Sequence, residues 1–273
     1  LNWMDVSNLS FNTLLLFEKV HFKWLPQSGI AKRGRNELAI AFKANPAVAW
    51  YAKNKCPEIA EWVDQLVDEV SNVQLSNHLV RQAEIEVMEA LNDWIVYVVD
   101  PSVYDAQPFL YWNSDELLKL TDFNRKTVVD IGAGTGRLTF TVAPYADCVY
   151  AVEPVYNLRE YVKKKSMEKG FNNVFVTDGL ITDIPFNTGF ADVTMSGHVF
   201  GDNLLGEWRE LERITKPGGM VILCPGNNDK DNNVHSFLID QGCSWSCFEE
   251  PGDEMKRKYW KTIQISDYKD ERG

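Results

Sequence analysis

Residues 127–140 read TVVDIGAGTGRLTF, and three glycines in this stretch decide how the chain folds around it. The first four residues, TVVD, predict a strand, and the residues from Arg137 onward predict a helix. Gly132, Gly134 and Gly136 therefore lie where the chain turns from strand to helix. Without Cβ atoms such a turn lets a ligand approach the backbone, and its N–H groups can bind polar atoms. The stretch predicts a ligand site.

The spacing of these glycines excludes two common nucleotide motifs. The dinucleotide fingerprint needs glycine at the first, third and sixth positions. Counted from Gly132 the sixth residue is Arg137, and counted from Gly134 it is Thr139. A P-loop is excluded as well, because no Gly-Lys-Ser/Thr follows.

Outward from this stretch, residues 122–273 alternate between strand-like and helix-like segments. TVVDI, CVYAVE, NVFVTD, ADVTMSG and GGMVILCPG predict strands, and the segments between most of them predict helices. This alternation predicts an α/β domain with a mostly parallel sheet and helices on both faces. SWSCFEEP and KRKYWKTI, separated by PGDE, predict a hairpin that makes the last strand antiparallel.

Residues 1–121 have a different, helical pattern. Asn45-Pro46 and Cys56-Pro57 place proline where a first helical turn tolerates it, and IAEWVDQLVDEV repeats apolar residues at three- and four-residue steps. The segment has no repeat and no low-complexity linker. We predict an all-α region that serves as a lid or binds a substrate or partner.

Composition limits the classes of partner. The 28 Lys plus Arg against 39 Asp plus Glu give a net charge of −11, which repels nucleic acid. No run approaches the roughly 18 apolar residues of a membrane helix, so we expect no membrane span and a cytoplasmic protein. The five cysteines are odd in number and scattered, which argues against a disulfide framework. Cys243 and Cys247 lack a second pair at ligand spacing, so we expect no metal site.

The turn resembles the first motif of class I S-adenosylmethionine-dependent methyltransferases, in which an acid closes the first strand and a G-x-G-x-G turn follows. Asp130 and the three glycines occupy those positions. The resemblance implies a Rossmann-like sheet of seven strands and S-adenosylmethionine as cofactor. Its amino-acid end would lie over the turn, where Asp130 would assist in holding the ammonium group. Glu153, at the end of the second strand, would accept both ribose hydroxyls.

Other parts of the pattern are also present. Asp178 and Gly179 end the third strand, where the family contacts the adenine, although about two extra residues separate them from the following DIPF. ERITKPGGMVIL resembles the helix, turn and fifth strand of the family, with residues 216–219 as a structural turn. The positions that the resemblance assigns to the cofactor are Asp130, Gly132, Ala133, Gly134, Gly136, Glu153, Pro154, Asp178, Gly179, Leu180, Ser196 and Gly197.

Methyl transfer from a sulfonium is an in-line displacement that needs mainly proximity and alignment. A protein base is needed only where the acceptor atom carries a proton. The stretch SGHVFGD follows the fourth strand, where the family presents groups to the acceptor, and His198 is the candidate base with Asp202 as its orienting partner. The alternative is that His198 caps a strand or packs against the adenine.

The sequence thus predicts an enzyme that methylates a small or medium-sized molecule. The signature of adenine amino-group methylation, Asn/Asp-Pro-Pro-Tyr/Phe, is absent after the fourth strand, which with the acidic charge disfavours nucleic acid substrates. Two alternatives stay open: a non-catalytic cofactor-binding module that docks a protein partner, and a protein or tRNA methyltransferase. The oligomeric state is not predicted.

Overall fold

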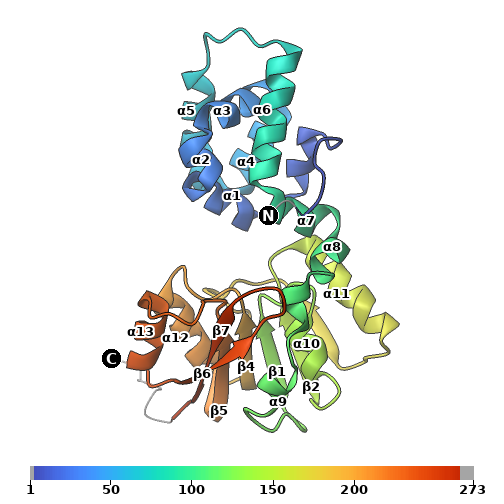
Figure 1. Ribbon diagram of the computed structural model, residues 1–273, viewed down its shortest axis with the longest axis vertical. Coiled ribbons are helices and arrows are strands. Elements are labelled where there is room, and N and C mark those ends of the chain that lie inside the picture. Colours follow the sequence, from blue (N-terminus) through green and yellow to red (C-terminus); the bar gives the residue numbers. More distant parts are fainter. Residues whose placement is uncertain (1–2, 265–273) are drawn as a thin grey trace. The chain divides into compact units, whose positions relative to one another are not determined.

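The computed structural model describes residues 3–264, and the chain divides into two compact units. The first contains Leu1–Tyr104 and Val155–Asn157, and the second contains Asp105–Pro154 and Leu158–Gly273 (Figure 1). The sequence pattern places a boundary after residue 121, whereas the contacts place it after Tyr104. The difference arises because Trp112 and Leu117 pack into a hydrophobic cluster of the second unit.

The first unit is built of short helices. Its elements are η1 (Phe11–Leu16), α1 (Lys19–Trp24), η2 (Leu25–Gln27), α2 (Gly29–Arg33), α3 (Arg35–Ala44), α4 (Pro46–Lys55), η3 (Pro57–Ile59), α5 (Ala60–Glu69), α6 (Asn77–Ala90), α7 (Asn92–Val99) and α8 (Pro101–Asp105). Helix α3 is buried along LAIAF, and α5 and α6 pack against it. A helix that is apolar over so much of its surface forms the centre of its unit.

Local signals explain several ends of these helices. Pro46 and Pro57 occupy first turns, as the sequence predicts. Ser76 caps α6 by accepting a hydrogen bond from Leu79 N at 3.2 Å. Lys43 Nζ donates to the carbonyl oxygens of Val70, Ser71 and Val73, which follow α5 and would otherwise need water.

The second unit contains a seven-stranded sheet with the order β3-β2-β1-β4-β5-β7-β6. Its elements are η4 (Pro108–Tyr111), α9 (Asp115–Leu118), β1 (Thr127–Ile131), α10 (Arg137–Val142), β2 (Cys148–Val152), α11 (Tyr156–Glu168), β3 (Val174–Thr177), β4 (Ala191–Gly197), α12 (Leu204–Ile214), β5 (Thr215–Cys224), α13 (Asn233–Asp240), β6 (Ser244–Glu249) and β7 (Met255–Thr262). Strand β7 runs antiparallel to β5 and β6, while β1 to β5 pair in parallel. The predicted α/β class and antiparallel last strand are confirmed.

Residues 216–219 differ from their predicted role as a separate turn. They lie within β5, where the pairing with β4 shifts in register between Ala191 and Val193. Gly218 has a φ of +80°, and its N–H donates to Ile263 O at 2.8 Å. The glycines therefore form an irregularity inside the strand, where Thr215 pairs with Ala191 of β4 but pairing with β7 begins only at Met220.

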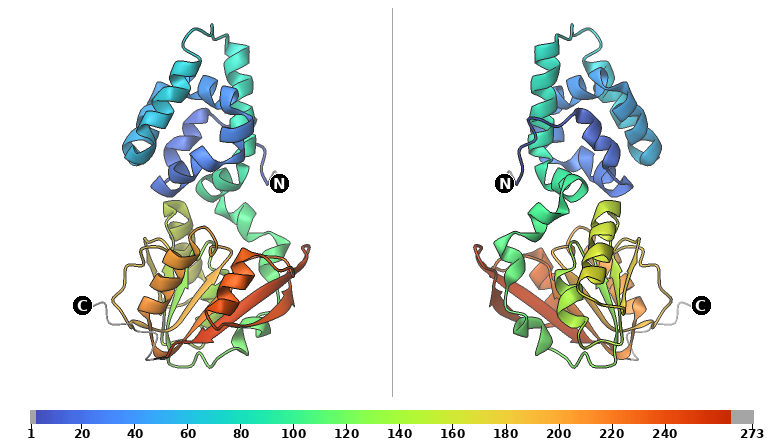
Figure 2. Two further views of the ribbon diagram at one scale, coloured as in Figure 1. Left: turned by 90° about the vertical axis from the view of Figure 1, so that its left-hand side faces the viewer. Right: turned by 90° about the vertical axis from the view of Figure 1, so that its right-hand side faces the viewer.

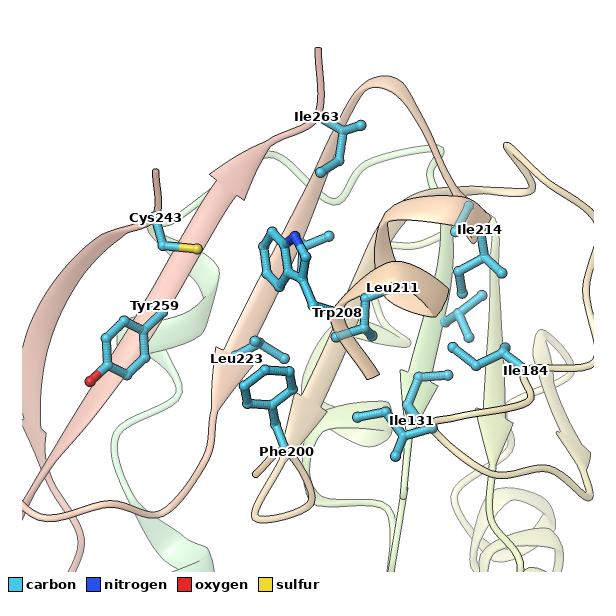
Figure 3. Close-up of a cluster of buried hydrophobic side chains, with 14 of the residues drawn as sticks. Ile131, Ile184, Phe200, Trp208, Leu211, Ile214, Leu223, Cys243, Tyr259 and Ile263 are labelled. Atoms are coloured by element: carbon cyan, nitrogen blue, oxygen red, sulfur yellow. The ribbon is translucent and has the colours of Figure 1, made fainter. Parts of the chain in front are cut away.

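Hydrophobic clusters lie on both faces of the sheet, and Figure 2 shows the helices that cover these faces. On one face, Trp208, Leu211 and Ile214 of α12 pack against Ile131 and other strand residues, as Figure 3 shows. On the other face, Leu138 and Val142 of α10 pack against Val128 and Val193, together with Trp112. Because both faces are covered, the carboxyl ends of the parallel strands are left to form the site, as in other open α/β sheets.

Candidate cofactor and acceptor site

Asp130 lies in β1, just before the glycine turn, and only 1% of its surface is exposed. Its Oδ2 accepts hydrogen bonds from Thr139 N at 2.9 Å and from Thr139 Oγ1 at 2.6 Å. These bonds tie the strand to the first turn of α10. Its Oδ1 is buried and has no protein partner. A buried carboxylate oxygen without a donor is costly, so this atom is suited to receive one from a ligand.

The environment of Asp130 shifts its acidity. Burial raises the pKa of Asp130 to about 6, and this effect is larger than that of the two hydrogen bonds from Thr139, which lower the pKa. The side chain is thus close to taking up a proton at neutral pH. A bound cation would stabilise its ionised form, which agrees with the predicted role of holding an ammonium group.

The glycine turn takes the conformation that its sequence predicts. Gly132, Gly134 and Gly136 have φ values of +67°, +55° and +86°, a region that favours glycine. A Cβ at Gly132 would collide with Val199 Cγ2, and a Cβ at Gly136 with Phe140. The first and last glycines are therefore needed for space as well as for conformation.

Four N–H groups of the turn, those of Gly132, Ala133, Gly134 and Gly136, have protein partners, whereas the sequence analysis expected the turn to bind a ligand through such groups. Gly132 N and Ala133 N donate to Val152 O at 2.8 and 3.1 Å, and Gly136 N donates to Ala133 O at 2.7 Å. Gly134 N donates to Glu153 Oε2 at 2.9 Å. The turn is folded back on β2 by these bonds, so side chains such as Asp130 carry the polar interactions still open to a ligand.

Glu153 and Pro154 follow β2, at the carboxyl end of the sheet. Only 4% of Glu153 is exposed, and its Oε2 bond to Gly134 N holds its carboxylate beside the turn. Its backbone oxygen accepts a bond from Arg159 Nη1 at 2.7 Å. The structure thus brings Asp130, the turn and Glu153 together, as the sequence predicts. Pro154 is half-buried.

Asp178, Gly179 and Leu180 follow β3, the neighbour of β2. The Asp178 side chain is 73% exposed, and its carboxylate pairs with Arg159 at 3.1 Å. At Gly179 a Cβ would come within 2.7 Å of both Pro185 Cδ and Val152 Cγ1, so glycine is required by packing. Leu180 pairs with Asp183 in an isolated bridge, where the two extra residues of this loop are accommodated.

Ser196 and Gly197 end β4, next to β1. Ser196 is 1% exposed, and its Oγ is buried without a partner. The same holds for Thr135 Oγ1 in the glycine turn, a residue that the sequence reasoning missed. The signal for Thr135 is its place between two glycines of the turn. Two buried hydroxyls and one carboxylate oxygen thus lack protein partners near the carboxyl ends of β1 and β4.

His198 directly follows β4 and takes a φ of +58°, which is uncommon for a residue with a Cβ. Its N–H donates to Cys224 O at 2.8 Å, and its ring packs against Phe109 with centroids 5.8 Å apart. Its Nε2 lies 2.7 Å from Glu250 Oε1. The carboxylate that contacts His198 is therefore Glu250 and not Asp202, whose side chain is exposed on the segment before α12.

Sequence reasoning missed Glu250, which is 1% exposed. It follows β6, and side chains alternate along a strand, so Glu250 lies on the same face as Phe248, which is also buried. The stretch SWSCFEEP contains no signal for its burial, because Trp245 and Cys247 alternate on the opposite face of the strand. It could not indicate the partner, because His198 is distant in the sequence.

Two side chains fix the segments around His198. Glu207 of α12 accepts hydrogen bonds from Gly201 N at 2.7 Å and Asn203 N at 2.8 Å, which holds the loop after β4. Arg137 of α10 donates to the carbonyl oxygens of Leu110 and Trp112, which holds the segment that carries Phe109. Trp112 is buried and packs against Phe248 with ring centroids 5.1 Å apart.

One family model and several known proteins are similar to this chain in sequence. Residues 129–223 match the family model of the methyltransferase domain. Among curated relatives, the demethylmenaquinone methyltransferase of Lactococcus lactis is 27% identical over 41% of this chain and 46% of its own length. The cypemycin N-terminal methyltransferase of a Streptomyces species is 30% identical over 36% of this chain and 41% of its own length. The chain thus spans less than half the length of these relatives.

A solved structure of a SAM-dependent methyltransferase from Aquifex aeolicus superposes with a TM-score of 0.49 and 20% identity, covering 60% of this chain and 99% of that chain. The family match confirms the resemblance within residues 129–223, and S-adenosylmethionine is the cofactor that the family implies. Within residues 3–264, no helix is long and apolar enough to cross a membrane.

Proposed function

We propose that the chain is an enzyme that transfers a methyl group from S-adenosylmethionine to a small or medium-sized molecule. The observation that carries this proposal is Asp130, a buried carboxylate at the end of β1 with one oxygen lacking any protein partner. It precedes a turn whose three glycines have positive φ, and it lies in the segment that matches the methyltransferase family.

The residues fit this cofactor. Asp130 Oδ1 would accept a hydrogen bond from its ammonium group, which offsets the cost of burying the carboxylate. Glu153 would bind the ribose hydroxyls, and Asp178, Gly179 and Leu180 would lie against the adenine. Ser196 and Thr135, with their buried hydroxyls, would contribute further hydrogen bonds. When bound, the cofactor supplies a methyl group that its sulfonium makes electrophilic.

The chain's own task is then to place the acceptor in line and, where needed, to take its proton. His198 is the proposed base, because it lies at the end of β4 with 36% of its side chain exposed to solvent and potential substrates. An acceptor that is a hydroxyl or a carbon acid needs such a base. One similar protein is a demethylmenaquinone methyltransferase, so we propose a quinol or phenol as the first acceptors to examine.

The test is methyl transfer from isotope-labelled S-adenosylmethionine to a panel of naphthoquinols, phenols, small amines and peptides with free N-termini. We expect label in at least one small acceptor, and none with the variant Asp130→Ala. Donor binding without transfer to any acceptor would favour the non-catalytic module. Transfer to the peptides alone would favour a protein methyltransferase.

A further inference from the structure

Glu250 is a buried carboxylate that directly follows β6. Only 1% of its surface is exposed, and it lies beside Phe248 at the end of β6. One oxygen, Oε2, is buried with no protein partner, and the other, Oε1, lies 2.7 Å from His198 Nε2. Burying a carboxylate with so few donors is expensive, so its retention needs a reason beyond packing.

Other cations near Glu250 do not supply that reason. Lys258, which is also buried, donates to the backbone oxygen and the carboxylate of Glu116. Arg257 donates to Asp229 at 2.8 Å and to Asp231 at 2.9 Å. The imidazole of His198 is therefore the group that Glu250 contacts within the part of the chain that the structure describes.

The position of the imidazole ring is fixed from several sides. The backbone at His198 is held in a left-handed conformation by the bond from its N–H to Cys224 O at 2.8 Å. Phe109 packs on the ring, and the ring lies so close to Gly226 that a Cβ there would collide with Nδ1 and Cε1. Gly226 itself has a φ of +79°. A strained residue held by this many contacts is a feature of functional sites.

We propose that Glu250 is the positioning residue of His198: it accepts a hydrogen bond from Nε2–H and so leaves the lone pair of Nδ1 to take a proton from the methyl acceptor. The catalytic part of this proposal rests on the proposed function, whereas its geometry rests on the distance of 2.7 Å between His198 Nε2 and Glu250 Oε1. When the acceptor's O–H or C–H bond breaks, its proton forms a bond with Nδ1 and its electron pair stays on the atom that receives the methyl group. The carboxylate of Glu250 stabilises the imidazolium, which later releases the proton to water.

The contact between Glu250 and His198 also limits which methyl acceptors the site can use. A base held by a buried carboxylate is useful only where the acceptor atom carries a proton at neutral pH. The acceptor is therefore a hydroxyl compound, a carbon acid or an amine that is protonated at neutral pH, and not a thioether or an already deprotonated amine. Within the panel of the proposed function, we expect quinols, phenols and enols first.

One experiment needs neither cofactor nor acceptor. The full chain with ¹⁵N-labelled histidine is studied by long-range ¹H–¹⁵N correlation at alkaline pH, and the His198 signals are assigned by their loss in His198→Asn. We expect the Nε2–H form of the neutral ring in the native chain and in Glu250→Gln, whose amide oxygen still accepts. We expect that preference to be lost in Glu250→Leu. Native-like signals in Glu250→Leu, or an Nδ1–H ring in the native chain, would overturn the proposal.

A second experiment measures the consequence for catalysis with the panel acceptor that the native chain methylates. Glu250→Gln keeps the Nε2–H form but removes the negative charge that stabilises the imidazolium, so we expect it to lower kcat roughly a hundredfold, within the range of about 10²–10⁴ that a general base contributes, with KM and cofactor affinity unchanged. Glu249→Gln makes the same change at the neighbouring exposed residue and is expected to act as native. Equal kcat in the two variants would overturn the role of Glu250. If the native chain binds no S-adenosylmethionine, the proposed function fails, and the NMR result alone decides the geometry.

Discussion

At the scale of single residues, the acidity of Asp130 offers a test that is independent of activity. Burial raises its pKa from 3.8 to about 6, so at pH 7 the folded state holds an ionised carboxylate that it disfavours. The ionised carboxylate lowers the free energy of unfolding by its full amount above about pH 6, and this loss disappears as Asp130 takes up a proton while the pH falls toward 4. The difference corresponds to about 3 kcal/mol of unfolding free energy.

We therefore expect Asp130→Asn to raise the unfolding free energy at pH 7 by up to about 3 kcal/mol, and the gain to vanish near pH 4. Urea unfolding at the two pH values measures it. Asp192→Asn is the control of opposite sign, because hydrogen bonds from Lys216 and Thr127 N outweigh burial and lower the pKa of Asp192. That variant should be destabilised at pH 7. A loss of stability in Asp130→Asn at pH 7 would contradict the account.

Two glycines with positive φ, one in the glycine turn and one in β5, allow the cost of backbone conformation to be separated from the cost of a steric clash. Gly132 and Gly218 both have positive φ, at +67° and +80°, but a Cβ would collide with Val199 at Gly132 and meet nothing within 4 Å at Gly218. We expect Gly218→Ala to cost about 1 kcal/mol of unfolding free energy, and Gly132→Ala about 1–3 kcal/mol more. Thermal unfolding compares the two variants. Equal costs would show that Val199 does not limit the turn.

Residue roles were predictable only where they follow from local sequence. Asp130, the glycines and Glu153 could be placed together because each ends or follows a strand of a parallel sheet. Glu250 could not, since its contact with His198 depends on β7 pairing with β5 and so adding β6 at the edge of the same sheet. The protein acceptors of the turn N–H groups were also not predictable, because they depend on how closely the turn approaches β2.

At the scale of elements, Arg137 links α10 to the segment before the sheet. Its guanidinium donates to Leu110 O and Trp112 O, to Thr141 Oγ1, and to Ser114 Oγ at 3.2 Å, and it lies over the Trp112 ring. Lysine cannot make this planar set of bonds. We expect Arg137→Lys to speed amide exchange in residues 110–114.

Arg213 provides a reciprocal control for this prediction. It holds a different loop by donating to Phe186 O at 2.6 Å and Ile184 O at 2.9 Å. Hydrogen exchange by mass spectrometry should show faster exchange in residues 184–186 for Arg213→Lys, and in residues 110–114 only for Arg137→Lys. The same exchange pattern in both variants would mean that global unfolding, and not release of one segment, is being measured.

The order of the elements was predictable from the sequence, and their ends less so. The alternation of strands and helices after residue 122 and the final hairpin correspond to β1 through β7. The start of β5 was predicted too late, because two glycines and a proline favour a turn when read locally, whereas the pairing of Thr215 with Ala191 of β4 extends the strand through them.

At the scale of the whole molecule, the charge pattern argues against RNA as substrate. The net charge is −11, and two short basic clusters of the sequence pair with acidic side chains. On α11, Lys163, Lys164 and Lys165 pair with Glu160, Glu168 and Asp105. On β7, Lys256, Arg257 and Lys258 pair with Asp253, Asp229 and Glu116.

We accordingly expect no binding of tRNA at 50 mM salt, a condition that favours electrostatic association. Fluorescence anisotropy of labelled tRNA with the native chain measures it. A tight complex that weakens steeply with added salt would contradict this reading and favour a tRNA methyltransferase. The role of the helical unit as a lid stays a prediction that these measurements do not address.

We propose above all that Asp130 at the end of β1, the glycine turn and Glu153 bind S-adenosylmethionine. Calorimetric titration of the native chain, Asp130→Ala and Glu153→Ala with S-adenosylmethionine and S-adenosylhomocysteine tests it most directly. Glu160→Ala, which removes an exposed acid that pairs with Lys163 on α11, is the matched control. The account predicts micromolar binding to the native chain and to the control, and none to the other two variants. Absence of binding to the native chain would contradict it.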